Sequence, residues 1–331
     1  VPYYHGPAQF LRRFGEIRSA VRSAYDPHSA VILRVGSTIG GLLIPLLKRN
    51  RHPFALEVVG DPWDVFAPGA VRHPLRPLIR RWSTARLRRQ CQDAAAVAYV
   101  TEFALQRRYP PAPDAFTTHY SSIELPAEAF AAEPRSFTDH QGRFRVISVG
   151  SMETMYKGMD VLIDAVAQCR RNGFDVELVL IGGGKHRPEL EARAAGHGIA
   201  EHVHFRGQLS SGQAVRDELD QADLFVLASR TEGLPRAVIE AMARGLPCIG
   251  SRVGGIPELL RDQDCVPPGD ASALAAKVMD VVGDAEQRSR MSVRNLERAA
   301  DYRDDVLSSR RRQFYETLRQ RTCDMTRLVS H

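Results

Sequence analysis

The sequence predicts an α/β protein with two domains built on parallel sheets, of which the second is doubly wound. The chain has 331 residues, a length that usually divides into two domains. Short apolar segments alternate with helix-like segments of about ten or more residues, which is typical of parallel sheets covered by helices. The alternation breaks at the proline-rich residues 110–113 and in the weakly periodic residues 121–141, so we place the interdomain linker there.

The individual elements follow from this alternation in chain order. In the first half we expect helices over residues 7–24, 38–50 and 75–90, and strands over residues 30–35, 54–59 and 94–100. The second half is more regular. Strands are expected over residues 144–149, 176–181, 203–206, 224–227 and 247–250, with helices over residues 158–171, 188–195, 212–222, 235–244 and 305–319. Because ligands of such sheets bind at the carboxyl ends of the strands, we look for chemistry there.

The composition is that of a globular cytoplasmic protein. Apolar residues make up 44% of the chain and charged residues 25%. The longest nearly uncharged apolar run, Thr38–Leu47, is about half as long as a membrane-spanning helix needs to be. No signal peptide is recognisable at Val1. The five cysteines are scattered and never spaced as CxxC, which indicates thiols in a reducing compartment and argues against a zinc site or a disulfide framework.

Basic residues are unevenly distributed. The net charge is +6, and Val71–Arg89 contains seven arginines without an acidic residue, while Arg310–Arg312 form a second cluster. A solvated helix face is the commoner explanation of such a segment. The segment also carries Leu and Trp side chains, so peripheral contact with the inner face of an anionic membrane stays open as an alternative. Neither segment carries a nucleic-acid reader motif, so we expect no nucleic-acid partner.

The strongest chemical pattern is the nine-residue segment from Glu232 to Glu240 (EGLPRAVIE), directly after an expected strand. Pro235 suits the first position of a helix, where its missing N–H is not needed. The helix would then present free N–H groups and a partial positive charge at the strand end, which suits a diphosphate. Glu240 would lie about 8 Å further along the helix axis. Two carboxylates at this spacing can accept hydrogen bonds from sugar hydroxyls, although an isolated pair is more often a solvated loop residue and an ordinary helix residue.

This segment is part of a longer resemblance. Residues 229–259 (SRTEGLPRAVIEAMARGLPCIGSRVGGIPEL) resemble the donor-site signature of the retaining glycosyltransferases of family 4, which have the GT-B fold. Residues 149–160 (VGSMETMYKGMD), 180–185 (LIGGGK) and 203–207 (VHFRG) resemble the accompanying loops and strand end. The resemblance implies two Rossmann-like domains whose parallel sheets face each other across a cleft. It implies an acceptor domain over residues 1–135, a nucleotide-sugar domain over 143–304, and a helix over 305–322 that packs back toward the first domain.

The resemblance also assigns roles to individual residues. Glu232 would bind hydroxyls of the donor sugar, and Glu240 would bind the ribose. Lys157 would bind the diphosphate and stabilise the charge that grows on the leaving oxygen. The remaining donor-binding candidates are Ser151, Gly182, Gly183, Gly233, Leu234, Pro235 and Arg236.

Three features depart from the family pattern. Ser151 stands where the family usually has an arginine, so Arg230, Arg236 or Lys185 would have to neutralise the rest of the diphosphate. The stretch around Asp61 lacks the family's catalytic-site histidine. Asp61 is therefore the candidate that would orient the acceptor hydroxyl, with helix capping or a turn as the alternative role. Family members also begin with a further strand, glycine loop and helix before the counterpart of Val1, so we expect an incomplete N-terminal domain.

Together these features predict a retaining, metal-independent hexosyltransferase that needs no cofactor. The donor would be a UDP-sugar in preference to a GDP-sugar, and the acceptor a polysaccharide, a lipid-linked sugar or a small natural product. The triplet Asp262-Gln263-Asp264 lies in an expected polar turn, so we predict no metal site. Two alternatives stay open, a nucleotide-sugar epimerase on a similar fold and a catalytically idle nucleotide-sugar-binding protein.

Overall fold

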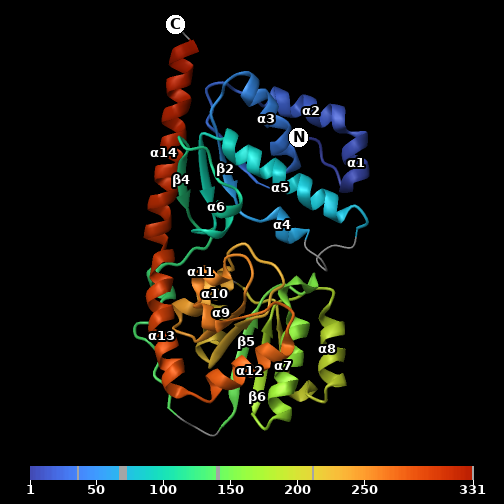
Figure 1. Cartoon of the computed structure of the whole chain (residues 1–331), viewed down its shortest axis with the longest axis vertical. Coiled ribbons are helices and arrows are strands. Elements are labelled where there is room, and N and C mark those ends of the chain that lie inside the picture. The colour runs from blue at the N-terminus through green and yellow to red at the C-terminus, as the bar shows by residue number, and fades with distance from the viewer. Residues whose placement is uncertain (36, 67–72, 139–141, 211, 330–331) are drawn as a thin grey trace. The chain divides into compact units, whose positions relative to one another are not determined.

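The computed structural model describes residues 1–35, 37–66, 73–138, 142–210 and 212–329. Within these residues the chain forms two compact units, each with its own parallel sheet (Figure 1). The first unit comprises residues 1–66, 73–120 and the chain from Ser308 onward, and the second comprises Ser121–Leu307. Val71 and Arg72, the first residues of the arginine-rich segment, lie outside the described residues.

The first unit has a four-stranded sheet in the order β1-β2-β3-β4, with every neighbouring pair parallel. Its strands are β1 (Val31–Arg34), β2 (Phe54–Val58), β3 (Ala96–Tyr99) and β4 (Phe116–His119). Its helices are α1 (Gly6–Arg12), α2 (Phe14–Ser23), α3 (Thr38–Arg49), α4 (Pro62–Val65), α5 (Arg76–Asp93) and α6 (Ala104–Arg108). All four residues of β3 are buried, because this central strand is covered on both faces.

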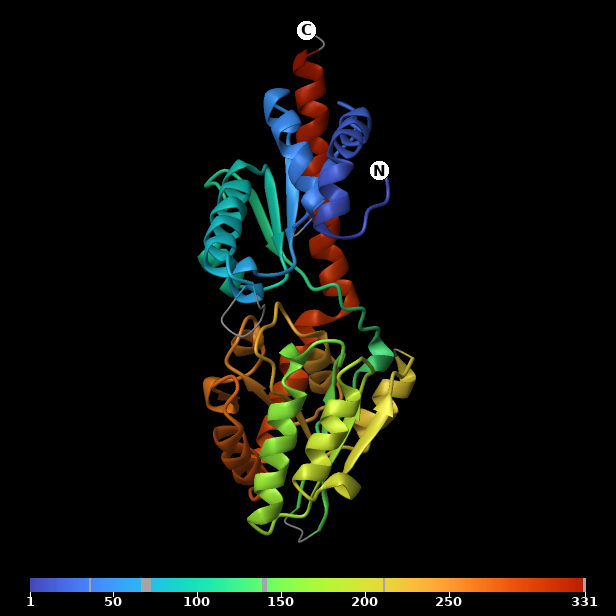
Figure 2. The same cartoon turned by 90° about the vertical axis from the view of Figure 1, so that its right-hand side faces the viewer.

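The last helix, α14 (Asp304–Val329), lies along the sheet of the first unit from Ser308 onward (Figures 1 and 2). Arg321 fixes it to the strand edge, since Nη1 donates to the carbonyl oxygen of Ala95 at 2.6 Å and Nη2 donates to that of Asp114 at 2.9 Å. The buried Phe314 ring packs edge-on against Tyr120 at 5.9 Å between centroids. Long-range contacts therefore bring the end of the chain into the first unit.

The second unit has a six-stranded parallel sheet in the order β10-β9-β8-β5-β6-β7. The strands are β5 (Phe144–Val149), β6 (Val176–Ile181), β7 (Val203–Gly207), β8 (Leu224–Leu227), β9 (Cys248–Ser251) and β10 (Cys265–Val266). The order reverses direction between β5 and β8, which are neighbours in the sheet. In a doubly wound sheet this reversal opens a crevice at the carboxyl ends of the strands.

Helices α7 (Met159–Arg171) and α12 (Ala271–Val282) pack together in the main core of this unit. The others are α8 (Arg187–Gly196), α9 (Gln213–Asp220), α10 (Arg236–Ala243), α11 (Ile256–Leu259) and α13 (Ala285–Ala299). The predicted fold class, α/β with two domains built on parallel sheets, is confirmed, and the order reversal of a doubly wound sheet is present in the second unit. Among the described residues no helix is both long enough and apolar enough to cross a membrane.

Candidate active site

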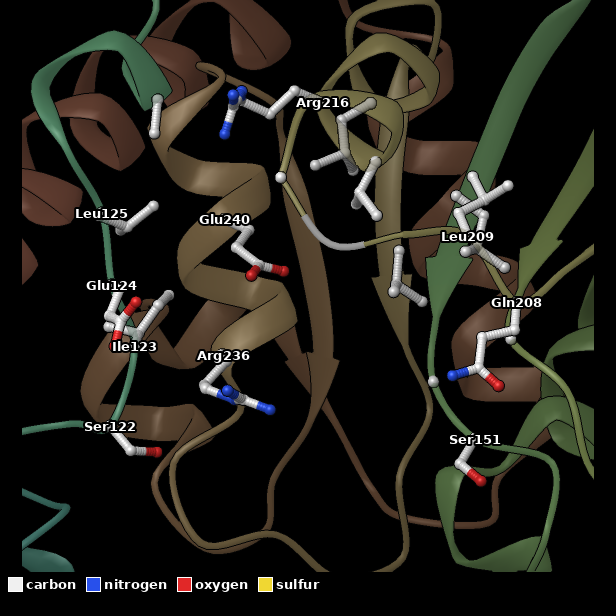
Figure 3. Close-up of a pocket in the computed structure, with 18 of the residues that line it drawn as sticks. Ser122, Ile123, Glu124, Leu125, Ser151, Gln208, Leu209, Arg216, Arg236 and Glu240 are labelled. Atoms are coloured by element: carbon white, nitrogen blue, oxygen red, sulfur yellow. The ribbon is translucent and has the colours of Figure 1, made fainter.

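A pocket of about 740 Å³ opens in the second unit where three neighbouring strands end (Figure 3). Ser151 follows β5, Gly182 and Gly183 follow β6, and Gln208 follows β7. The opposite wall is formed by α9, by α10, and by the segment that follows β4. Arg216, Arg236, Glu240 and Leu125 are among the residues of this wall. The pocket therefore occupies the crevice that the strand order creates.

Glu240 is the fifth residue of α10 and points into the pocket between Arg216 and Arg236 (Figure 3). Burial raises the pKa of this carboxyl above its usual 4.5, while the positive charges of Arg236 and Arg216 act in the opposite direction. Among the described residues none donates a hydrogen bond to it. A half-buried carboxylate with free acceptor oxygens suits a ligand that brings paired hydroxyls.

Lys157 and Glu232 form an ion pair beside the pocket. Nζ of Lys157 lies 2.7 Å from Oε1 of Glu232, and the Ser229 hydroxyl donates to the same oxygen at 2.6 Å. The side chains of Lys157 and Glu232 are only 16% and 7% exposed. The stem of Lys157 lies against Gly150, which lines the pocket, so the pair lies behind the pocket wall at this point.

Glycines allow the two loops of this pair to approach other main chain closely. Gly158, directly after Lys157, has φ +69°, and a Cβ there would collide with the carbonyl oxygen of Ala228. Gly254 has φ +53° and packs against the carbonyl of Glu232 in the same way. The N–H of Gly255 then donates to the carbonyl oxygen of Gly233 at 2.7 Å. The Gly254-Gly255 turn thus supports the loop that carries Glu232, a role that the sequence alone did not show.

Gly182 and Gly183 differ although both line the pocket. Gly182 has φ +134°, and a Cβ there would collide with the carbonyl oxygen of Gly150 on the neighbouring strand end. Gly183 has ordinary backbone geometry, and the nearest atom to its Cβ position is the Gln208 Cβ at 4.0 Å. The fold therefore requires glycine at 182, whereas glycine at 183 only keeps the pocket open.

The three candidates for a second diphosphate cation have different environments. Arg230 is bound to Asp160 by two hydrogen bonds of 2.8 and 2.7 Å and also donates to the carbonyl oxygen of Met155. Lys185 pairs with Glu153 at 3.2 Å and is 63% exposed. Arg236 lines the pocket at the first position of α10 and, among the described residues, has no ion-pair partner within 4 Å. Of these three cations, Arg236 is therefore the best placed to take over from the arginine that the family usually has at position 151.

Pro235 occupies the N-cap of α10, one position before the first helical position that the sequence suggested. It has φ −76° and ψ 111°, and the helix begins at Arg236. Gly233 and Leu234 lie in the loop before it, outside the pocket wall. The structure thus groups Ser151, Gly182, Gly183, Arg236 and Glu240 in the pocket, and places the remaining donor-site candidates in the loops beside it.

Several pocket residues were missed in the sequence. Gln208, Leu209 and Arg216 belong to the segment after β7, and Ser122–Leu125 belong to the segment assigned as linker. Gly207, the last residue of β7, marks a strand end, so Gln208 could have been found by the rule that ligands meet strand ends. Nothing local in Ser122–Leu125 indicates a pocket wall, because its position depends on long-range contacts such as that of Ala131 N–H with the Ala243 carbonyl.

Asp61 lies in the first unit and is 6% exposed. It caps α4 by accepting a hydrogen bond from the Trp63 N–H at 2.8 Å, and it also accepts hydrogen bonds from the Tyr109 hydroxyl and from Arg108. These contacts occupy both carboxylate oxygens. The arrangement favours the capping role over orientation of an acceptor hydroxyl.

The Asp262–Asp264 triplet forms a short 3-10 turn. Asp264 is fully buried and its Oδ2 lies 2.7 Å from Nη2 of Arg294, so this carboxylate serves a structural ion pair. Among the described residues no group of three or more His, Cys, Asp and Glu side chains is arranged to hold a metal ion.

The sheet order and the crevice at its strand ends define an α/β unit with a doubly wound parallel sheet. Residues 143–284, most of that unit, match the family described as "Glycosyl transferases group 1". The second unit is therefore similar to glycosyltransferases of this family, and the chain has the GT-B fold.

The chain is also similar to individual proteins of known sequence. The chain is 22% identical to Protein CapJ of Staphylococcus aureus over 90% of its own length and 74% of the relative's. It is 29% identical to a GDP-mannose-dependent alpha-(1-6)-phosphatidylinositol monomannoside mannosyltransferase of Mycolicibacterium smegmatis, over 65% of this chain and 60% of that one. The chain thus spans about two thirds of these relatives' lengths.

Two solved structures have a similar fold. Sucrose-phosphate synthase from Thermosynechococcus elongatus matches with a TM-score of 0.72 at 19% identity, over 95% of this chain and 80% of that one. HepE of Anabaena in complex with UDP-glucose matches with a TM-score of 0.65 at 19% identity, over 91% of this chain and 81% of that one.

Proposed function

We propose that the chain transfers a hexosyl unit from a nucleoside-diphosphate sugar to an acceptor hydroxyl, with retention at the anomeric carbon and without a metal ion. The observation that carries this proposal is the pocket at the strand ends, in which Glu240 and Arg236 lie on one helix. A carboxylate for the ribose and a cation with a helix N-terminus for the diphosphate are the groups that such a donor requires.

The donor would extend from Glu240 toward the Lys157–Glu232 pair. Its ribose hydroxyls would donate to Glu240, its diphosphate would contact Arg236 and the first N–H groups of α10, and its sugar hydroxyls would contact Glu232. In the reaction the bond from the anomeric carbon to the diphosphate oxygen breaks, and the acceptor oxygen bonds to the same face of that carbon. The leaving oxygen takes the acceptor proton. Lys157 would stabilise the charge on the leaving diphosphate as the bond breaks.

We infer a UDP-sugar in preference to a GDP-sugar as the donor. The structural neighbour from Anabaena was solved with UDP-glucose, which supports UDP, whereas the Mycolicibacterium relative is named as GDP-mannose-dependent. Calorimetric titration of the protein with UDP and with GDP separates the two donors. Tighter binding of GDP would reverse our assignment.

The test of the reaction itself is release of nucleotide from several UDP- and GDP-sugars, with and without sugar, lipid-linked or small-molecule acceptors, in the presence of EDTA. Acceptor-dependent release with an α-configured product from an α-configured donor supports the proposal. Conversion of the donor sugar to its epimer without acceptor would indicate the epimerase instead. Tight donor binding with no turnover on any acceptor would indicate an idle binding protein.

A further inference from the structure

The helix α5 exposes an apolar ridge in the first unit. Leu75, at its N-cap, is 54% exposed, Leu78 is 64% exposed and Trp82 is 62% exposed. Their spacing of three and four residues places them on one face of the helix. Leu87 and Cys91, further along the same helix, are buried. The second half of α5 thus packs into the domain, whereas Leu75, Leu78 and Trp82 in its first half are presented to the surface.

The arginines around this ridge form no close ion pair within the part of the chain that the structure describes. Helix α5 contains six arginines, and none of them lies within 4 Å of a carboxylate oxygen among the described residues. Arg76, Arg80 and Arg88 donate only to main-chain carbonyl oxygens. Arg81, Arg86 and Arg89 have neither a hydrogen bond nor an ion pair within the described residues. A set of exposed apolar side chains among unpaired arginines has the chemistry of a surface that meets anionic lipid.

A second pocket, of about 400 Å³, lies beside this ridge at the carboxyl ends of β1 and β2. Its lining is mostly apolar, including Val35, Val59, Phe66 and Ile79. Trp82 and Arg86 of α5 also line it. The ridge is therefore continuous with an apolar cavity that has a guanidinium group in its wall.

The fold makes room for that guanidinium. A Cβ at Gly41, in the second turn of α3, would collide with Nη2 of Arg86, so only glycine allows the side chain to lie there. Glycine inside a helix is less favourable than alanine. The Arg86 guanidinium also lies 5.2 Å from the centre of the Trp82 ring, which holds it beside the apolar ridge. Arg86 is thus positioned by two elements and has no anionic partner among the described residues.

We propose that this face of the first unit docks on an anionic lipid surface, with Leu75, Leu78 and Trp82 in the lipid and the phosphate of one lipid paired with Arg86 at the mouth of the pocket. The first methylene groups of that lipid enter the apolar pocket. Since the chain is proposed to transfer a sugar to a hydroxyl group, this site assigns the acceptor to membrane-bound phospholipids that carry a free hydroxyl. That assignment rests on the proposed function, whereas the docking on the membrane does not.

Docking is tested by co-sedimentation of the whole protein, without donor, with phosphatidylcholine vesicles and with vesicles containing phosphatidylglycerol, at low and at physiological salt. We expect binding to the anionic vesicles only, weaker at the higher salt. The double variant Arg81→Gln with Arg89→Gln should bind about 30-fold less, because each basic charge near the surface contributes about 1 kcal/mol. Leu78→Ser should also bind less.

Two variants in the same unit serve as matched controls. Leu11→Ser replaces a leucine that is 71% exposed on α1, and Arg18→Gln replaces an exposed arginine on α2. Both should bind as the unaltered protein does, and all variants should keep its melting temperature because the substituted side chains are exposed. Equal binding of the α5 variants and the controls, equal binding to neutral vesicles, or no binding to anionic vesicles at either salt would each overturn the proposal.

The Arg86 site is tested separately with a short-chain phosphatidic acid below its micelle concentration. Arg86→Gln should weaken binding at least tenfold. Gly41→Ala, which keeps the net charge but displaces the guanidinium, should weaken it as well. Inorganic phosphate binding as tightly as the lipid would show an anion site without a lipid role, and unchanged lipid affinity in both variants would remove Arg86 from the site. The same samples are also titrated with UDP-sugar. A protein that binds the donor but no lipid would leave the proposed function standing and would contradict the lipid proposal.

Discussion

Nζ of Lys157 lies 2.7 Å from Oε1 of Glu232, in a pair that the protein shields almost completely from solvent. One of these residues is proposed to bind the diphosphate and the other the donor sugar. Without donor, each neutralises the other. A diphosphate that enters beside Lys157 must therefore compete with Glu232 for the ammonium group. A sugar hydroxyl that donates to Glu232 would then replace the ammonium group as the partner of this carboxylate.

Lys157→Ala should lower kcat about 10²–10³-fold, because a fixed charge beside the leaving group acts mostly in the transition state. It should also reduce the free energy of unfolding by about 1–3 kcal/mol, since Glu232 keeps only the Ser229 hydroxyl as a partner in a shielded position. Steady-state kinetics and denaturant unfolding measure the two effects. Lys185→Ala is the control, because this lysine is 63% exposed and should change neither quantity. A wild-type kcat in Lys157→Ala would remove the diphosphate role.

Glu240→Gln should weaken donor binding and at the same time stabilise the free protein at neutral pH. Burial raises the pKa of Glu240 above 4.5, so protonation of this group favours the folded state. That contribution is fully present below pH 4.5 and is lost as the pH rises through the raised pKa. Glutamine is neutral at every pH and does not show this loss.

The measurement is the melting temperature of both proteins between pH 4 and pH 8, together with donor affinity by calorimetry. The two melting curves should separate as the pH rises, with the variant more stable. Glu201→Gln, at a glutamate that is 83% exposed, should show no such separation. Unchanged donor affinity in Glu240→Gln would exclude this residue from the ribose site.

Gly182→Ala and Gly183→Ala should have different effects although the residues are adjacent. At 182 the alanine has an unfavourable positive φ and collides with Gly150, so we expect a loss of at least about 1–3 kcal/mol in stability. At 183 the added methyl group reaches only the edge of Gln208, so the fold should be kept. Thermal unfolding of the pair decides, and equal melting temperatures would contradict the assigned backbone geometry at 182.

The regular parts of the fold were predictable because their signals are local. Strands β5, β6 and β8 begin and end at the expected residues, since each is a short apolar run between turn residues. Strand β4 was missed, because its four residues include two threonines and a histidine and lie at the edge of the sheet. The contacts by which Arg321 holds α14 against the first unit could not be predicted from the sequence either, because the arginine reaches carbonyl groups more than two hundred residues earlier in the chain.

The site was predictable to a similar extent. Glu240, Arg236 and Gly182, which were predicted from their positions after strands together with the family resemblance, line one pocket, because strand ends meet at one edge of a parallel sheet. The ion pair of Lys157 with Glu232, and the choice of Arg236 over Arg230, depend on which side chains meet in space. No spacing along the chain encodes those contacts.

Arg236→Ala should weaken donor binding by about tenfold or more while leaving the melting temperature nearly unchanged, because Arg236 is exposed and lines the pocket. Arg230→Ala should do the opposite. It removes two hydrogen bonds to Asp160 and one to the Met155 carbonyl, which together hold the loop after Thr154. Calorimetric donor titration and thermal unfolding of both variants make the comparison. Weaker donor binding in Arg230→Ala at an unchanged melting temperature would place the second cation at Arg230.

Asp61→Asn distinguishes a capping residue from one that orients the acceptor. The aspartate accepts hydrogen bonds from Trp63, Arg108 and Tyr109, and the amide that replaces it carries no charge for Arg108 and only one acceptor oxygen. We expect a loss of about 2–3 kcal/mol in the free energy of unfolding, because these hydrogen bonds are shielded and one of them is charge-assisted. Donor affinity should stay unchanged, since Asp61 and the donor pocket belong to different units.

Asp114→Asn, at an exposed aspartate of the same unit, is the control and should leave the stability unaltered. If Asp61→Asn instead kept its melting temperature and lost kcat at saturating donor, Asp61 would be the residue that orients the acceptor hydroxyl, and the capping role would be secondary.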